Sequence, residues 1–207
     1  MTARLDALRS RPRRPGLASF FWYEARFGSE AVKVMPGEYF VDSEELLVMT
    51  TLGSCVATCL WDRRARVGGM NHFMLPEAAG GGDGAEQGGR YGSFAMELLV
   101  NELLKRGATR PTLEAKVFGG GRIAAGMDSM DIGEANCRFV LDYLHAERIP
   151  VVSCDLRGIH PRKVCFLPAS GKAMVQRLAP ARAAALLDAE RSARRAAGAA
   201  TGSIELF

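Results

Sequence analysis

The chain has no apolar run long enough to cross a membrane, and its N-terminus lacks the apolar stretch of a secretory signal. Its five cysteines are odd in number and include no C-x-x-C pair, which argues against a disulfide framework and against a zinc site. Aromatic and basic residues do not interleave as they do on a nucleic-acid-binding surface. We therefore expect a protein of the reducing cytoplasm that inserts into no membrane, binds no nucleic acid and holds no metal.

The composition is that of an ordinary globular domain with a sizeable core. Of the 207 residues 48% are apolar and 24% are charged, and the net charge is +4. Much of the basic excess lies at the two ends, which we interpret as solvated tails. The sequence predicts a basic, disordered N-terminal extension over residues 1–18, a core domain over 19–179, and an Ala/Arg-rich C-terminal helix and tail over 180–207.

Periodicity predicts several strands and two core helices. Apolar stripes predict helices over residues 91–106 and 131–148, the second with a capping box made by Asp131 and Glu134. Short β-branched or apolar stretches predict the following strands: 32–41 interrupted by a Pro-Gly pair, 46–51, 56–61, 67–75, 113–118, 149–154, and a hairpin of 162–167 with 173–178. This mixture of strands and helices predicts an α+β domain.

One stretch, residues 50–76, combines a cysteine with a histidine. Cys55 lies in a tight Gly-Ser-Cys turn before the strand predicted over 56–61, and His72 lies within the strand predicted over 67–75. A hairpin of that length can place an imidazole beside a thiol, as an activated cysteine nucleophile requires. The alternative is that Cys55 is a small buried apolar residue and His72 an ordinary core or surface histidine. Local chemistry alone leaves both interpretations open.

Several separated motifs resemble those of one family. The stretches LGSCV and GGMNHFMLP around Cys55 and His72 are similar to the signature of the CheD family, the chemoreceptor glutamine deamidases of bacterial chemotaxis. Further similarity lies in residues 31–39, 114–121, 132–136 (an IGxxN helix start), 155–166 and 170–172. The resemblance covers roughly residues 31–178, and its motifs occur in the expected order.

The resemblance implies both a fold and an activity. The implied fold is a layered α/β sandwich with a β-sandwich core, similar to the cytotoxic necrotizing toxin-type deamidases. The implied activity is cofactor-free, hydrolytic deamidation of glutamine to glutamate on the cytoplasmic domains of methyl-accepting chemoreceptors, through a thioester. It further implies methylesterase activity on receptor glutamyl esters, and a CheC-type phosphatase as partner where the organism has one.

Roles for individual residues follow from the residues and the resemblance together. We expect Cys55 to be the nucleophile, reachable by substrate, and His72 to act as base and then as acid. The resemblance gives the orienting role to Thr50, although Thr51 is adjacent. Backbone N–H groups of the turn formed by Gly53, Ser54 and Cys55 could hold the oxyanion.

Two further residues are weaker candidates. Asn71 is an alternative to Thr50 as the group that orients His72, and it could also contact substrate. Because neighbouring strand residues face opposite ways, however, Asn71 and His72 would point to different faces of their strand. His160, ahead of the last hairpin, could touch substrate, whereas we interpret His145 as a solvated helix residue. The remaining thiols, Cys59, Cys137, Cys154 and Cys165, are expected to be buried.

Two rival functions stay open at this point. The same Cys–His pair could serve another cysteine amidase or peptidase, in which case the polypeptide itself would be cut. Alternatively, the chain could be a non-catalytic adaptor that binds receptors or a phosphatase, in which case replacing Cys55 would leave its biological effect intact.

Overall fold

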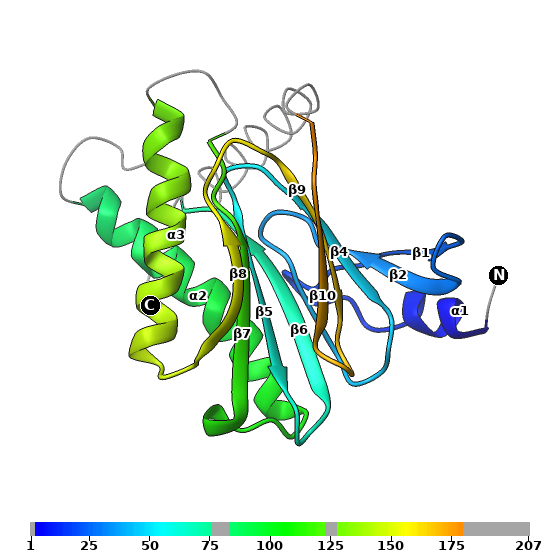
Figure 1. Cartoon of the computed structure of the whole chain (residues 1–207). Helices are drawn as coiled ribbons and strands as arrows, with labels where there is room; N and C mark the ends of the chain where they lie inside the picture. The colour runs from blue at the N-terminus through cyan, green and yellow to red at the C-terminus, as the bar shows by residue number, and fades with distance from the viewer. Residues whose placement is uncertain (1–2, 76–82, 123–127, 180–207) are drawn as a thin grey trace, which may run out of the picture.

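The computed structural model describes residues 3–75, 83–122 and 128–179, which form two five-stranded sheets and a layer of helices (Figure 1). The strands are β1 Phe20–Glu24, β2 Ser29–Lys33, β3 Tyr39–Asp42, β4 Leu47–Leu52, β5 Val56–Asp62, β6 Val67–Phe73, β7 Leu113–Gly119, β8 Val151–Leu156, β9 Arg162–Leu167 and β10 Lys172–Arg177. The helices are α1 Ala3–Arg9, α2 Asp83–Lys105 and α3 Asp128–Ala146, with a 3₁₀ turn at Arg110–Thr112.

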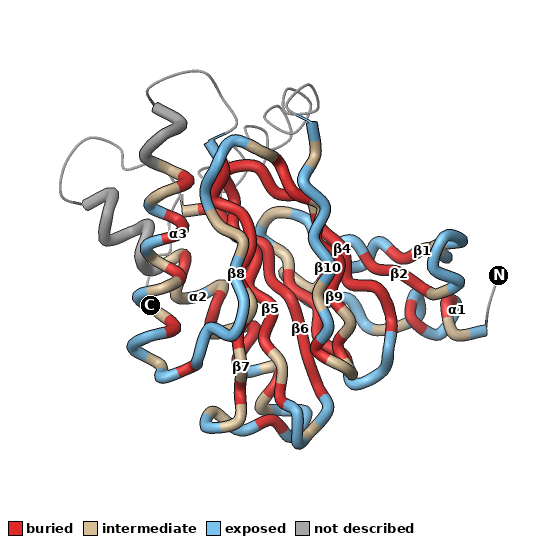
Figure 2. Tube along the Cα trace, viewed as in Figure 1, coloured by how far each residue is buried: buried red, intermediate tan, exposed pale blue. Residues whose placement is uncertain are grey.

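The sheets stack as two layers with the helices as a third. The outer sheet has the order β1-β2-β4-β9-β10, and the central sheet has the order β3-β6-β5-β7-β8. Pairs β2–β4 and β7–β8 are parallel, and every other neighbouring pair is antiparallel. Helices α2 and α3 cover the face of the central sheet that points away from the outer sheet (Figure 1). The inner strands β5 and β6 of the central sheet are therefore buried on both faces, whereas its edge strand β8 is largely exposed (Figure 2).

Alternation along β5 divides its residues between two cores. Ala57 and Cys59 face the outer sheet and pack in the core between the sheets, whereas Val56 and Leu60 face the helices. The two cores enclose β5 and β6 in apolar side chains, which fixes the register of this hairpin, because a slip of one residue would exchange its faces. Of the predicted Cys–His pair, His72 lies within this hairpin and Cys55 immediately precedes its first strand.

The predicted α+β class and a sandwich of two sheets with helices are confirmed. The predicted core helices and strands are present with shifted ends, except that the interrupted strand predicted over 32–41 is two strands, β2 and β3, which belong to different sheets. Helix α2 begins at Asp83 rather than at residue 91, and α3 begins at Asp128. The predicted capping box at Asp131 is wrong, because that residue lies inside the helix. Residues 180–207, predicted to form a C-terminal helix and tail, lie outside the described residues.

The predicted disorder of the N-terminal extension is wrong for its described part. Helix α1 is formed, and Leu5 and Leu8 are each only 2% exposed. Their side chains join the core between the sheets, next to Phe21 of β1. Arg11 adds an ion pair of 2.7 Å to the buried Asp42. The extension is thus docked by apolar burial at one end of the sandwich, despite its basic composition.

Among the helices that the structure describes, none is long and apolar enough to cross a membrane.

Candidate active site

The β5–β6 register brings Cys55 and His72 to the same face of the central sheet. Ala57 pairs with His72 and Val56 with Phe73, so Cys55, one residue earlier, lies level with Met74. The Cys55 Sγ is 3.7 Å from the Met74 Sδ. Cys55, Ala57, His72 and Met74 alternate onto the face that points to the outer sheet. Cys55 is thus the diagonal cross-strand neighbour of His72, within the reach of an imidazole ring.

Thr50 of β4 reaches His72 from the opposite sheet. Its Oγ1 donates its only proton to the Val34 carbonyl at 2.8 Å and lies 2.8 Å from the His72 Nδ1. Since that proton is already used, the hydroxyl must accept from Nδ1–H. The Val34 carbonyl, 3.4 Å from Nδ1, is a second acceptor on the same side of the ring. The neutral imidazole is therefore the Nδ1–H tautomer, and Nε2 is the nitrogen able to take a proton.

Backbone hydrogen bonds hold the strand that carries the imidazole. The His72 N–H donates to Glu38 O at 3.0 Å, and the His72 carbonyl accepts from the Gly37 N–H at 2.8 Å. These bonds continue the β3–β6 ladder past Tyr39, across the turn that contains Pro36 and Gly37. The predicted interruption of the strand at this Pro-Gly pair therefore lies against His72.

The turn that carries Cys55 is bonded to the end of β7. The Gly121 N–H donates to Gly53 O at 2.7 Å, and the Gly120 N–H donates to Cys55 O at 2.8 Å. Gly119 has φ +114°, and a Cβ at that position would overlap the Cys55 carbonyl. Only glycine permits this approach, so the predicted Gly-rich strand end is a backbone support for the cysteine turn.

A buried amide binds the same turn from the helical layer. Asn136 of α3 donates from Nδ2 to Ser54 O at 2.9 Å and accepts at Oδ1 from the Leu75 N–H at 2.8 Å. Asn136 is the last residue of the IGxxN motif, for which the sequence predicted no role. The sequence could have indicated that Asn136 is buried, because it lies at four-residue spacing from Val140 and Leu144, on the buried face of the helix.

The site is closed in this structure. Cys55 is 0% exposed and His72 is 2% exposed, and Thr50 and Ser54 are buried as well. The expectation that Cys55 is reachable is therefore wrong for this conformation, in which the thiol also contacts Met74. Burial raises the pKa of Tyr91, and the negative charge of a Cys55 thiolate nearby adds to that rise.

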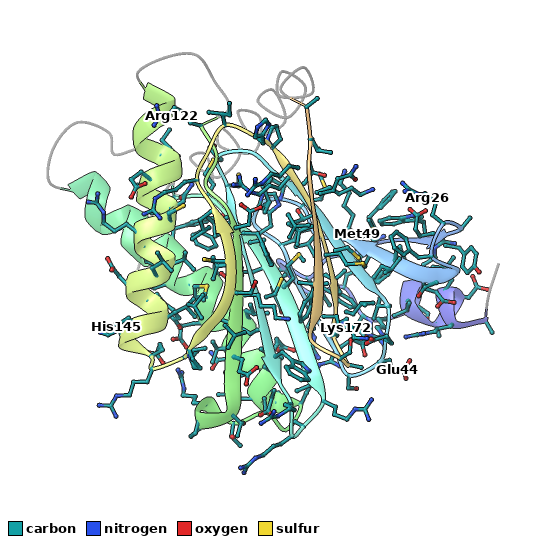
Figure 3. The ribbon with its side chains drawn as sticks, viewed as in Figure 1. Arg26, Glu44, Met49, Arg122, His145 and Lys172 are labelled. Carbon is teal, nitrogen blue, oxygen red and sulfur yellow. The ribbon has the colours of Figure 1, made fainter. Side chains whose placement is uncertain are left out.

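The structure separates the weaker candidates. Asn71 faces α2, where its amide accepts from the Thr58 N–H at 3.0 Å and donates to Ala95 O at 3.1 Å, so it does not join His72. The His160 carbonyl lies beside Gly121, next to the cysteine turn. His145 is exposed near the C-terminal end of α3, on the far side of the helical layer from the outer sheet (Figure 3).

The other thiols divide into two groups. Cys59, Cys137 and Cys165 are buried as predicted, and burial raises the pKa of each, that of Cys165 to about 11. Cys154 is exposed, which contradicts the prediction. It lies on β8, an edge strand that pairs only with β7, so the layers that cover the central strands leave it open.

These residues form a Cys–His–Thr line beside a backbone turn whose N–H groups lie next to the cysteine. A thiol, an imidazole and a hydroxyl that can orient the imidazole are the groups that a cysteine acyl-transfer site requires. Within the described residues, no group of three or more His, Cys, Asp or Glu side chains could hold a metal ion.

Comparison with known proteins places the chain in a family. Residues 74–177 match the sequence profile described as "CheD chemotactic sensory transduction". The chain is 54% identical to a probable chemoreceptor glutamine deamidase CheD 1 of Albidiferax ferrireducens, covering 99% of this chain and 87% of that protein. It is 45% identical to a probable chemoreceptor glutamine deamidase CheD of Thiobacillus denitrificans, covering 92% of this chain and 96% of that protein. The chain belongs to the CheD family.

Proposed function

We propose that this protein deamidates glutamine side chains of chemoreceptors, with Cys55 as nucleophile, His72 as base and acid, and Thr50 as the group that orients His72. The names of its relatives support the reaction and the receptor substrate. The observation that carries the mechanism is the Thr50–His72 hydrogen bond, because it fixes the Nδ1–H tautomer and directs Nε2 toward proton transfer.

The reaction begins with formation of a thiolate. His72 Nε2 takes the Cys55 proton, and the thiolate sulfur adds to the glutamine carboxamide carbon to give a tetrahedral oxyanion. A free thiol of pKa about 8.5 is mostly protonated at neutral pH, so the neighbouring imidazole is needed. Backbone N–H groups of the cysteine turn hold the oxyanion, each worth about 3 kcal/mol.

Collapse of the oxyanion breaks the C–N bond. The His72 imidazolium donates its proton to the leaving nitrogen, which departs as ammonia, and the acyl group stays on Cys55 as a thioester. Water, deprotonated by the now neutral His72, adds to the thioester carbon and releases glutamate and the Cys55 thiol. The reaction uses no cofactor, and its atoms balance as glutamine plus water giving glutamate plus ammonia.

The closed site adds a requirement on the substrate. Since Cys55 is fully buried and its thiol contacts Met74, a receptor helix has to open the site when its glutamine enters. This opening would couple turnover to receptor docking and protect the thiol at other times.

Three further expectations belong to the same proposal. Receptor glutamyl methyl esters would be hydrolysed by the same thioester route, with methanol in place of ammonia. A CheC-type phosphatase would be a partner where the organism has one. The protein would act in the cytoplasm, on the receptor domains located there.

The likeness to the cytotoxic necrotizing toxin-type deamidases stays a prediction that comparison of the fold with theirs would test.

The test is the intact mass of a receptor cytoplasmic fragment incubated with the protein. Wild type should add about one dalton per converted glutamine and release one ammonia each, and Cys55→Ala should do neither while still binding the fragment. A cut fragment would instead indicate the peptidase. If Cys55→Ala kept full activity, the cysteine mechanism would be wrong, and if wild type bound without any mass change, the adaptor would be favoured.

A further inference from the structure

The amide of Asn136 bridges the two segments that border the thiol. It is 0% exposed, donates to Ser54 O at 2.9 Å and accepts from the Leu75 N–H at 2.8 Å. Ser54 immediately precedes Cys55, and Leu75 immediately follows Met74, whose sulfur contacts the Cys55 Sγ. A single side chain from α3 therefore holds both the nucleophile turn and the strand end that covers it.

Peptide geometry gives this contact a consequence for chemistry. The Ser54 carbonyl and the Cys55 N–H belong to one planar peptide unit, and the described residues contain no cis peptide bond. In a trans unit the carbonyl and the N–H point in opposite directions. Holding the Ser54 carbonyl toward α3 thus fixes the direction of the Cys55 N–H. Donation to the carbonyl also polarises the unit and makes that N–H a stronger donor.

We propose that Asn136 is a positioning residue that holds the Ser54–Cys55 peptide so that the Cys55 N–H is aimed at the oxyanion. The inference rests on the proposed function, because it assumes that an oxyanion forms on a carbonyl attacked by Cys55. It adds a residue that lies 82 positions from Ser54 in the chain and that sequence reasoning left without a role.

The contact is supported by close backbone packing of α3. A Cβ at Gly133 would lie 2.8 Å from the Gly120 carbonyl oxygen, which is too close for any real side chain. Gly120 in turn donates to Cys55 O, and Gly121 donates to Gly53 O. The helix, the end of β7 and the cysteine turn therefore form one rigid unit, in which Asn136 supplies the side-chain link.

The chain contains a matched control for Asn136. Asn71 is also buried, and its amide likewise accepts from one backbone N–H and donates to one backbone carbonyl, with a further contact to the Met96 Sδ at 3.3 Å. Its partners, Thr58 and Ala95, tie β5 to α2 on the face of the central sheet away from Cys55. The two asparagines thus perform the same structural task, and only one of them contacts the cysteine turn.

The experiment compares Asn136→Asp with Asn71→Asp on a receptor cytoplasmic fragment. Each carboxylate keeps the acceptor and loses the donor, so both variants should lower the thermal midpoint by similar amounts. Asn136→Asp should lower kcat about 100-fold with KM changed by less than about threefold, whereas Asn71→Asp should leave kcat within about threefold. Asn136→Ser, which removes the link without adding a charge, should behave like Asn136→Asp.

A second readout separates positioning from collapse of the site. The pH dependence of Cys55 alkylation should be the same in Asn136→Ser, which adds no charge beside the thiol, and in wild type, since His72 and Thr50 generate the thiolate without Asn136. A shifted alkylation profile, a kcat no lower than that of Asn71→Asp, or failure of both Asn136 variants to fold while Asn71→Asp folds would overturn the inference. Absence of ammonia release by wild type would instead refute the proposed function.

Discussion

The hydroxyl of Thr50 has one proton, which it donates in a hydrogen bond to the Val34 carbonyl. This single fact at the residue scale sets the tautomer of His72 and hence which ring nitrogen can serve Cys55. The pair is buried, so water does not compete for the hydroxyl, and the hydrogen bond orients the ring more strictly than it could at the surface. In our account the function of Thr50 is geometric: it touches the base and does not touch the substrate.

Replacing Thr50 with Val tests this account without changing side-chain shape. Thr50→Val removes the nearer acceptor of the Nδ1–H and leaves only the Val34 carbonyl at 3.4 Å, so the ring is held less strictly and kcat for ammonia release should fall about 10- to 100-fold. Thr50→Ser keeps the hydroxyl and should retain most of the activity.

Thr58→Val is the matched control for this substitution. The Thr58 Oγ1 is buried and has no hydrogen-bond partner among the described residues, so losing it should leave kcat unchanged and stability unchanged or raised. Equal activity of Thr50→Val and Thr58→Val would show that the Thr50 hydroxyl does not orient a catalytic base.

At the scale of elements, the β5–β6 hairpin and helix α1 differ in how far their sequences determine their positions. The hairpin could be predicted, because apolar alternation and the polar turn between residues 61 and 67 fix its strands and register. The docking of α1 could not, because Leu5 and Leu8 are the only large apolar residues of a short helix in a basic segment. Their burial depends on the end of the sandwich against which they pack.

The same contrast holds for the candidate site. The nearness of Cys55 to His72 follows from one local hairpin and could be predicted. The contacts of Asn136 with Ser54, and the exposure of Cys154 on an edge strand, depend on strand order and on helix placement. These are long-range consequences that no local pattern encodes.

Because α1 is docked through apolar contacts, removing one of these contacts should measurably lower the free energy of unfolding. Leu5→Ala should lower the free energy of unfolding by about 2 to 5 kcal/mol, because it leaves a cavity in the core between the sheets. Asp6→Ala, at an exposed position of the same helix, should change it by less than about 0.5 kcal/mol. Urea unfolding would measure both. Equal values would mean that α1 is not docked in solution.

At the scale of the whole molecule, Asp155 joins the edges of the two sheets. It lies on β8 of the central sheet and binds Arg162 of β9 at 3.0 Å and Arg177 of β10 at 3.1 Å, both on the outer sheet. Arg162 is buried, so its charge depends on this partner. Partial burial works to raise the pKa of Asp155, but hydrogen bonds from Arg177 and Arg162 outweigh it and hold that pKa below its ordinary value.

A depressed folded-state pKa predicts a definite dependence of stability on pH. The contribution of Asp155 is complete above its unfolded pKa of about 3.9 and is lost as the pH falls through the lower folded value. At pH 7, Asp155→Asn should cost about 3 kcal/mol of unfolding free energy, and this cost should shrink below about pH 4.

The exposed Asp142 supplies the control for this prediction. Asp142→Asn should match wild type at every pH. A cost of Asp155→Asn that did not change with pH would show that the charge of Asp155 does not join the sheets.

The central claim, a Cys55 thiolate supported by His72, is tested most directly by the pH dependence of alkylation. The exposed Cys154 would compete for reagent, so the measurement uses a Cys154→Ser background and follows iodoacetamide labelling of Cys55 by peptide mapping. Closure of the site slows labelling at every pH alike, so the midpoint of the profile still reports thiolate formation. We predict a midpoint below the ordinary thiol value of about 8.5 in this background and a clearly higher midpoint when His72→Ala is added. Identical midpoints, or faster labelling of Cys59 than of Cys55, would contradict the account.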